Sequence, residues 1–416
     1  MLTIALNQDW QVHQLDVANA FLHGNLEETV YMAQPRGFED STHPEYVCLL
    51  HKAIYGLKQA PRQWYNTFTS FLVSIGFYHS NADPSLMIFK QNNTCLYLLM
   101  YVDDLLITGN NHKDISTVID KLSQQFTMKH LGQVHEFLGI KIDRSTNTYF
   151  LSQRKYTESI LHQARLTNCK SLANPNCTKL PSNLQEDPVL SDPTTYRRII
   201  GSLQYLVLTR PNIAYSINQL SQHMQQPLLQ HTYLLKRLLR YIKGTIDYGI
   251  PITKSNLVLH SFSDADWAGD PDTRKSISGY CSFLGTSLIS WTVKKQNTVA
   301  RSSTKSKYMA LASLTVDVIW LRRLLEDFGT QQLQPTSMFC DNTSAIVLAN
   351  NHVFHARTKH VEIDQKFIRD HILQNHVQLL PLSTIDQTTD IFTKALSTPR
   401  FIQLINKLTI TAPPSV

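Results

Sequence analysis

The chain has 416 residues, of which 42% are hydrophobic and 17% are charged, and its formal net charge is +7 at pH 7. These values are typical of a globular protein with two or three domains, each with its own core, and they exclude a largely disordered chain. The positive charge favours an anionic partner, although charge alone does not identify nucleic acid.

The sequence carries no signal for secretion or membrane insertion. No apolar run approaches the roughly 18 residues that a membrane span needs. The N-terminus lacks the basic start, apolar core and cleavage site of a signal peptide. The six cysteines show neither CxxC spacing nor paired histidines nearby, so reduced thiols are expected rather than a zinc site. We therefore expect an intracellular protein of the cytoplasm or nucleus.

The N-terminal segment carries the first candidate site residue. Residues 2–6 indicate the end of a helix, and residues 12–17 form a strand-like run that contains Asp16. An isolated aspartate within a strand is costly unless it is paired or binds a metal ion. Further along, Pro61 before an apolar run predicts a helix start.

A β-hairpin with two carboxylates is predicted next. The apolar runs 95–102 and 105–108 are joined by Asp103 and Asp104, which indicates a tight turn at the Asp-Asp pair. Two adjacent like charges raise each other's pKa unless a cation lies between them. An ordinary solvated turn is the alternative, because Asp is a common turn residue. A third carboxylate on a neighbouring strand would complete a site for two cations, and oxygen ligands suit Mg²⁺.

The middle of the chain is mainly helical. Residues 113–125 have helical periodicity and precede a strand at 126–129, whereas the Pro-, Asn- and Ser-rich stretch 168–195 is a candidate linker. In the helix predicted at 231–244, one side is basic and the other apolar. The basic side, Lys236, Arg240 and Lys243, suits a helix that lies along a duplex backbone, although a solvated face is an equal alternative.

After Gly249 the pattern of predicted elements changes. A strand at 257–263 leads to Asp264, a hairpin follows at 279–291, and a long helix covers 304–328. A further strand at 337–340 ends at Asp341. An acid therefore follows each of two strands.

Several motifs resemble those of one family. Tyr101-Val102-Asp103-Asp104 resembles the YxDD box of reverse transcriptases, and residues 16–21 resemble their first catalytic motif. Residues 51–65 resemble the substrate-binding motif in the form used by copia-type retrotransposons, and the match continues through 126–142, 197–224 and the C-terminal third. On these residues the chain is identified as a member of the copia-type Pol polyproteins, with reverse transcriptase and ribonuclease H regions.

The resemblance implies an α/β (α+β) fold and a polymerase site. It implies a palm with an antiparallel sheet, a helical thumb or connection, and a ribonuclease H-like mixed α/β domain. Asp16, Asp103 and Asp104 would hold two Mg²⁺ ions, and the partners would be an RNA template, a DNA primer, dNTPs and RNA/DNA hybrid. The sequence leaves the oligomeric state open.

Other residues acquire expected roles from the same resemblance. Phe21 would be a steric gate against ribose, with a core phenylalanine as the alternative. Tyr55, Gly56 and Lys58 would line the nucleotide pocket, although a lysine before a helix is usually just solvated. Lys129 would protonate the leaving group, and Leu138 with Gly139 resembles the primer grip.

The ribonuclease H resemblance comes with a departure. Asp264 matches the first acid and Asp341 the third, each expected to bind metal, and Glu362 is the first choice for the fourth, with Asp364 as the alternative. Where the family has two glutamates, the second acid among them, this chain has Lys305 and Lys307. A lysine that bridges Asp264 or Asp341 would take the metal's place, so this centre is expected to be impaired.

The expected organisation follows from these motifs. A palm covers 1–145 without the fingers subdomain that precedes it in the family, and a thumb or connection covers 146–249. The ribonuclease H-like domain covers 250–382, and a C-terminal tail at 383–416 resembles the end of copia-type polyproteins, so the end is expected to be nearly complete.

Three functional classes remain open at this point. The first is a polymerase with an impaired ribonuclease H. The second is an inactive retroelement remnant that retains nonspecific hybrid binding. The third is a ribonuclease H that uses a substitute carboxylate, Asp266, Asp270 or Asp272.

Overall fold

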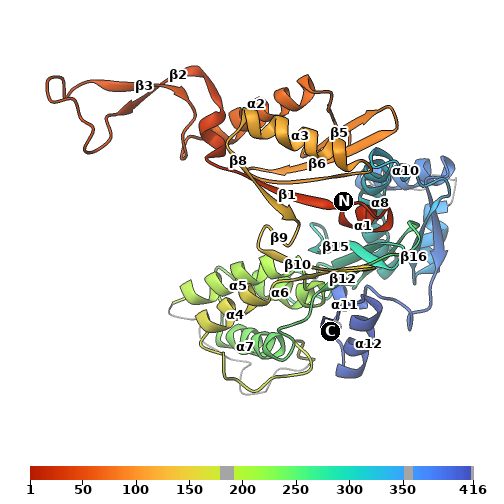
Figure 1. The fold of residues 1–416 in the computed structure, drawn as a ribbon. Helices are drawn as coiled ribbons and strands as arrows, with labels where there is room; N and C mark the ends of the chain where they lie inside the picture. Colours follow the sequence, from red (N-terminus) through yellow and green to blue (C-terminus); the bar gives the residue numbers. More distant parts are fainter. Residues whose placement is uncertain (179–191, 351–358, 414–416) are drawn as a thin grey trace. The chain divides into compact units, whose positions relative to one another are not determined.

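The chain folds into two compact units. The computed structural model describes residues 1–178, 192–350 and 359–413. The first unit is formed by Gln8–Leu138 together with Met1, and the second by Leu2–Asn7 and Gly139–Val416 (Figure 1). None of the helices in the described part of the chain is both long and apolar enough to cross a membrane.

The first unit is built on a six-stranded sheet in which every neighbouring pair is antiparallel. Its strand order is β4-β5-β6-β7-β1-β8. The strands are β1 (Val12–Val17), β4 (Tyr78–His79), β5 (Leu86–Gln91), β6 (Thr94–Tyr101), β7 (Asp104–Gly109) and β8 (Met128–Gln133).

Helices α2 (Ala60–Ser74) and α3 (His112–Gln125) cover one face of this sheet (Figure 1). Leu15 and Val17 of β1 belong to the same core as Trp64 of α2 and Ile115 of α3. Because side chains alternate along a strand, Asp16 faces away from these helices. The helices therefore lie on one face of the sheet and the Asp16 carboxylate on the other.

A two-stranded ribbon projects from the first unit (Figure 1). It is formed by β2 (Asn25–Ala33) and β3 (Val47–Lys52), which pair antiparallel after the short 3-10 helix η1 (Ala20–His23). Short strand β9 (Glu136–Phe137) lies at the end of the unit.

The second unit begins with a small antiparallel sheet and a group of helices. Strands β10 (Ile140–Ser145), β11 (Thr148–Ser152) and β12 (Ile250–Thr253) pair in the order β12-β11-β10. The helical elements are α1 (Leu2–Asn7), α4 (Arg154–Gln163), α5 (Thr194–Leu206), η3 (Pro211–Ile213), α6 (Ala214–Ser221) and α7 (Leu229–Gly244).

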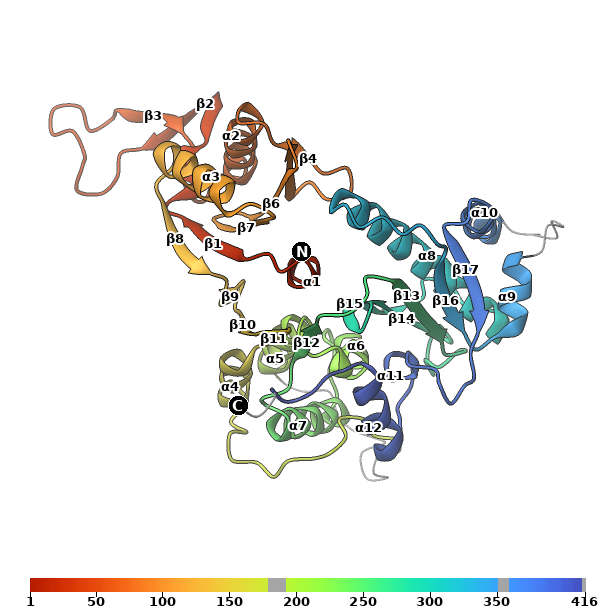
Figure 2. The same ribbon diagram turned by 45° about the vertical axis from the view of Figure 1, so that its right-hand side comes forward.

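The second unit also contains a five-stranded mixed sheet (Figure 2). Its order is β15-β14-β13-β16-β17, with antiparallel pairs from β15 to β13 and parallel pairs from β13 to β17. This is the arrangement expected of a ribonuclease H-like domain. The strands are β13 (Leu259–Ala265), β14 (Ile277–Leu284), β15 (Ser287–Lys295), β16 (Thr336–Cys340) and β17 (Val377–Pro381).

Helices of the C-terminal third pack around this sheet. They are α8 (Ser303–Asp327), α9 (Thr343–Asn350), α10 (Lys359–Leu373), α11 (Asp390–Thr393) and α12 (Thr398–Lys407). Ser302 begins α8, since its side chain accepts a hydrogen bond from Lys305 N. Tyr308, Leu311 and Thr315 are buried on the side of the helix that faces the sheet.

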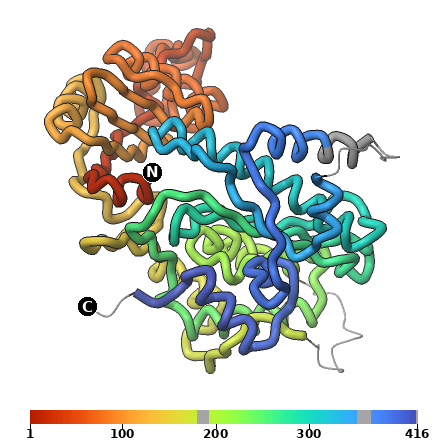
Figure 3. Tube along the Cα trace, turned by 90° about the vertical axis from the view of Figure 1, so that its right-hand side faces the viewer, coloured from red at the N-terminus to blue at the C-terminus, as the bar shows by residue number. Residues whose placement is uncertain are grey.

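One core joins the helical group, the mixed sheet and the C-terminal segment. The segment predicted as a tail contributes Phe392 and Phe401, both 0% exposed. Phe401 packs edge-on against Tyr241 of α7, with ring centroids 5.5 Å apart. Figure 3 shows the C-terminal segment running beside the helices of residues 200–250. The segment 383–413 is therefore part of this core.

Candidate active sites

The sheet of the first unit brings three aspartates to one end. Asp16 of β1 lies directly opposite Asp104 of β7 in the antiparallel register. Val17 N donates a hydrogen bond of 2.9 Å to the carbonyl oxygen of Asp103. Residues separated by almost ninety positions in the sequence thus become neighbours through strand pairing alone.

The turn of the hairpin differs from the prediction by one residue. Strand β6 ends at Tyr101 and β7 begins at Asp104, so the two turn residues are Val102 and Asp103 rather than the Asp-Asp pair. Val102 adopts a left-handed φ of 56°, which is strained for a β-branched residue. Trp64 Nε1 donates a hydrogen bond of 2.7 Å to the Val102 carbonyl oxygen and holds this conformation. The register depends on turn type, which apolar patterning does not fix.

The three carboxylates interact electrostatically. The pKa of Asp104 is raised, first by desolvation and then by the charges of Asp103 and Asp16. A bound cation would remove this cost, and an all-oxygen donor set fits Mg²⁺. Within the described residues, however, no three acidic, histidine or cysteine side chains are already grouped closely enough to hold an ion. Strand pairing brings the three aspartates close along the backbone, but their side chains would have to turn toward one another to bind an ion.

Aromatic residues adjoin the carboxylates. Phe21 of η1 packs against Tyr55, with ring centroids 4.6 Å apart, and Tyr55 is 54% exposed. Phe21 also lines a pocket of about 230 Å³ together with Trp64, Tyr101 and Val102. The structure therefore places Phe21 beside the turn that carries Asp103, half-buried and packed against the core of the first unit.

The remaining predicted nucleotide-pocket residues lie at different places. Lys129 of β8 is exposed and lies opposite Asp16 in the register. Gly56 has a positive φ of 97°, which only glycine adopts easily, and Lys58 beside it is exposed. Leu138 and Gly139 form a tight turn with φ values of 50° and 67°.

A second acidic centre lies in the mixed sheet. Asp264 lies near the end of β13 and is 0% exposed, and Asp341 follows the parallel strand β16. Lys307, in the second turn of α8, lies between them. Its Nζ is 2.9 Å from Asp264 Oδ1 and 2.5 Å from Asp341 Oδ1. The ammonium group therefore occupies the space between the two carboxylates, as the sequence predicted.

A second ammonium group, from Lys394, reaches the same aspartate. Lys394 Nζ lies 3.2 Å from Asp264 Oδ2, and the Thr393 hydroxyl donates a 2.6 Å hydrogen bond to that oxygen. Burial alone would raise the pKa of Asp264, but Lys394, Lys307 and Thr393 together hold it below its usual range. Desolvation would lower the pKa of Lys307, yet Asp264 and Asp341 raise it. Both lysines are therefore held as cations.

Asp390 is a site residue that sequence reasoning missed. It is buried, it lies 2.5 Å from Lys394 Nζ, and Arg400 Nη2 lies 3.1 Å from its other oxygen. Lys394 thus links Asp390 to Asp264. The sequence signal that could have indicated this ion pair is an aspartate followed four residues later by a lysine, within an apolar run of the segment predicted as a tail. The predicted fourth acid, Glu362, and its alternative Asp364 lie in α10, but their side chains are outside the described ones.

The three substitute carboxylates have distinct surroundings. Asp266 is half-buried, burial raises its pKa to about 6, and its Oδ1 accepts a hydrogen bond from Ile277 N. Asp270 pairs with Lys295 at 2.5 Å, and its pKa is low in spite of desolvation. Asp272 is exposed. The charge of Asp264 also contributes to the raised pKa of Asp266.

The basic side of α7 is partly occupied by the chain itself. Arg240 Nε donates a 2.7 Å hydrogen bond to the carbonyl oxygen of Lys170, and Arg237 Nε donates one of 2.8 Å to that of Asn176. Lys236 is exposed and Lys243 half-exposed. Of the predicted basic side, Lys236 and Lys243 are therefore the residues most accessible to a partner.

Comparison with known proteins identifies the family. Residues 1–178 match the family described as reverse transcriptase (RNA-dependent DNA polymerase). The chain is 44% identical, over 100% of its length, to the retrovirus-related Pol polyprotein from transposon RE2 of Arabidopsis thaliana. The chain belongs to the copia-type retrotransposon Pol family. It is also 38% identical, over 96% of its length, to the Pol polyprotein from transposon TNT 1-94 of Nicotiana tabacum.

The copia-type relatives are much longer proteins. This Pol chain spans 29% of the length of the RE2 polyprotein and 31% of the TNT 1-94 polyprotein. Among solved structures, it resembles the foamy viral protease-reverse transcriptase in complex with RNA/DNA hybrid. That match has a TM-score of 0.49 and 10% identity, and it covers 92% of this chain and 45% of that one.

Proposed function

We propose that this segment of a copia-type Pol polyprotein is an RNA-directed DNA polymerase whose ribonuclease H-like centre is inactive. The observation on which the polymerase proposal chiefly rests is the strand register, which sets Asp16 opposite Asp104 with Asp103 in the adjoining turn. The proposed partners are an RNA template, a DNA primer and dNTPs. The family match over residues 1–178 supports the same reading.

In the proposed mechanism, Asp16, Asp103 and Asp104 would hold two Mg²⁺ ions. When bound, the ions supply activation of the primer hydroxyl and neutralise charge on the leaving pyrophosphate. Phe21 and Tyr55 form an aromatic surface beside the turn on which the sugar of a deoxynucleotide rests. Lys129, opposite Asp16, donates a proton or a hydrogen bond to the phosphates. Trp64 keeps the turn, and so Asp103, in place.

The ribonuclease H-like centre does not fit a metal ion in the same way. The Lys307 ammonium lies between Asp264 and Asp341, at the position that the cation would need. At an effective dielectric of about 20, each close charge pair at ~4 Å is worth roughly 4 kcal/mol, so displacing the ammonium is costly. This centre therefore takes no part in the proposed reaction.

Primer extension on an RNA template tests the polymerase. We expect Mg²⁺-dependent extension by the chain and a loss of about 10²-fold or more in Asp103→Asn, because a metal ligand is removed. Asp120→Asn, at an exposed position on α3, is the matched control and should extend normally. Absence of any Mg²⁺-dependent extension by the unaltered chain would overturn the polymerase proposal.

Cleavage of an RNA/DNA hybrid tests the second centre. The unaltered chain should not cut, whereas Lys307→Glu should gain Mg²⁺-dependent cleavage because it removes the ammonium and supplies an acid. Lys305→Glu, two residues away on α8, is the control and should stay inactive. If the unaltered chain already cuts at an ordinary rate, Lys307 does not block this centre, and Asp266 becomes the candidate acid.

A remnant that only binds hybrid is the second candidate function. It is favoured by the displaced metal position at Lys307 and by the absence of a preformed ligand group among the described residues. Salt-dependent binding without extension or cleavage would support it. Lys236→Ala should then reduce the salt dependence, since that lysine is the exposed member of the α7 stripe.

A further inference from the structure

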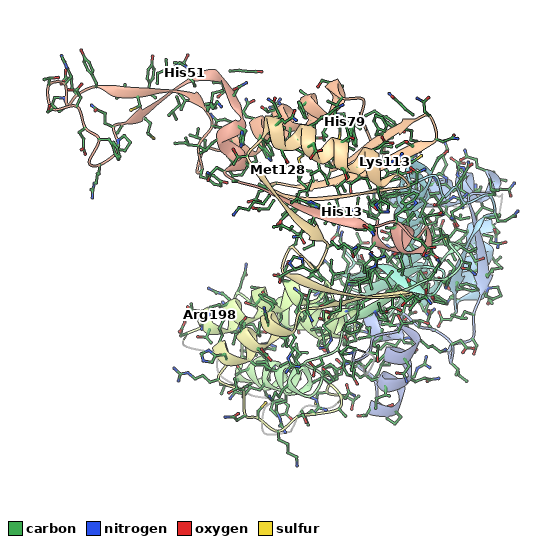
Figure 4. All side chains as sticks on the ribbon, viewed as in Figure 1. His13, His51, His79, Lys113, Met128 and Arg198 are labelled. Carbon is green, nitrogen blue, oxygen red and sulfur yellow. The ribbon has the colours of Figure 1, made fainter. Side chains whose placement is uncertain are left out.

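Two histidines distant in sequence meet on neighbouring strands of the first unit. His13 lies on β1 and His130 on β8, 117 positions apart, and His13 Nδ1 is 3.1 Å from His130 Nε2. Figure 4 labels His13 on β1 and Met128 at the start of β8, two residues before His130. A third histidine, His112, begins α3, and its ring centroid is 6.5 Å from that of His13.

The spacing of the two ring nitrogens suits a shared metal ion. Zinc binds imidazole nitrogen at about 2.0–2.1 Å, so two ligands of one tetrahedral ion lie roughly 3.3 Å apart. The observed 3.1 Å is close to that separation, and a hydrogen bond between neutral rings is the competing explanation. We propose that His13 and His130 form a site for a transition-metal ion of the zinc class, with His112 as the third ligand.

The third ligand has to move to complete the site. No group of three ligands is already gathered among the described residues. His112 is exposed at the first position of α3, where the Asn111 side chain caps the helix. Its ring can therefore turn toward His13 without breaking the cap. A water molecule would fill the fourth position of a tetrahedral site.

This site is distinct from the aspartates. His13 shares its strand face with Leu15 and Val17, which contact the helices, whereas Asp16 faces the other way. The ligands are imidazoles rather than carboxylates, which selects zinc-class ions over Mg²⁺. Desolvation, His130 and His112 all lower the pKa of His13, so its ring is neutral at pH 7, as a ligand must be.

The test is Zn²⁺ titration of the full chain by calorimetry, with Mg²⁺ present in excess. A second histidine pair, His371 and His376 with Nδ1 atoms 3.0 Å apart, could also bind the ion. The measurements therefore use a His371→Gln/His376→Gln background. One equivalent of Zn²⁺ should bind, and both His13→Gln and His130→Gln should weaken binding by at least about tenfold. His112→Gln should weaken it less.

The control variant is His43→Gln, at a ring that stacks on Tyr46 in the projecting ribbon. It should bind Zn²⁺ as the background does. His130 is exposed, so His130→Gln is expected to fold even if His13→Gln does not. The absorption spectrum of bound Co²⁺ should show tetrahedral coordination that is lost in His130→Gln. Equal Zn²⁺ affinity in the background and in His130→Gln would overturn the proposal.

Discussion

Lys307 Nζ lies 2.9 Å from the Oδ1 atom of Asp264, a carboxylate that is 0% exposed. The pair is buried, so each partner depends on the other for its charge. Removing one member of such a pair leaves an uncompensated charge, which typically costs about 3–5 kcal/mol. Lys307 therefore contributes to the stability of the second unit.

The first prediction concerns that stability. Lys307→Met should lower the free energy of unfolding by about 3 kcal/mol, because Asp264 and Asp341 then face each other without the ammonium. Urea unfolding followed by circular dichroism measures the change. Lys305→Met, in the same turn of α8, should alter stability by no more than about 0.5 kcal/mol. Equal effects of the two variants would show that the Lys307 ion pairs contribute little.

The second prediction concerns the close approach of the C-terminal segment to the sheet. A Cβ atom at Gly279 of β14 would lie 2.5 Å from Phe392 Cβ and 3.0 Å from Thr393 Cγ2. Gly279→Ala should therefore push α11 away and cost about 1–3 kcal/mol. Gly201→Ala in α5 meets nothing within 4 Å and should instead stabilise the helix by up to about 1 kcal/mol. Thermal unfolding of both variants checks the opposite signs.

The third prediction is a pH dependence. Desolvation, followed by the charge of His223, lowers the pKa of His231 from 6.5 to about 4, and its Nδ1 accepts a hydrogen bond from Leu228 N. Protonation therefore favours the unfolded state. The contribution to stability is complete above pH 6.5 and is lost as the pH falls toward 4.

Replacement by glutamine tests this dependence. His231→Gln keeps an acceptor for Leu228 N but cannot titrate, so it should flatten the fall in unfolding free energy between pH 7 and pH 5 in urea titrations. His223, which stacks on His231, is present in both proteins. The difference between their two pH dependences of unfolding free energy therefore reports the contribution of His231. An unchanged slope would assign the acid sensitivity to other groups.

The fourth prediction concerns the turn that carries Asp103. Trp64→Phe keeps the aromatic packing but removes the 2.7 Å hydrogen bond to Val102 O. Because Val102 is strained, the turn should relax, and kcat for primer extension should fall roughly tenfold with little change in KM. Trp10→Phe is the control, since Trp10 stacks on Tyr97 away from the turn. A change in KM without a fall in kcat would instead indicate that Trp64 acts in substrate binding.

Local patterns predicted most of the elements but not every contact between them. The strands around Asp16 and Asp264 follow from apolar runs, and α8 follows from helical periodicity with Tyr308 inward. The hairpin turn was displaced by one residue because turn type sets the register.

The missed contacts are long-range ones. The hydrogen bond from Thr393 to Asp264 spans 129 positions, and no local pattern marks it. For the same reason, the sequence predicts a C-terminal tail around Asp390, where the structure has a buried contact with Lys394. The meeting of His13 and His130 likewise depends on strand order, which neither residue's neighbourhood encodes.

Helix α1 precedes most of the first unit in the sequence but belongs to the second unit. Leu2–Asn7 belongs to the second unit, where Asn7 Oδ1 accepts a hydrogen bond from Ser255 N, whereas β1 belongs to the first. After Leu2, the polypeptide thus passes between the units twice, near residues 7 and 138. Cutting the chain once, at residue 138, would not produce two self-sufficient halves. The C-terminal fragment would lack six residues of its own structure, and adding them back as a peptide should restore part of its thermal stability.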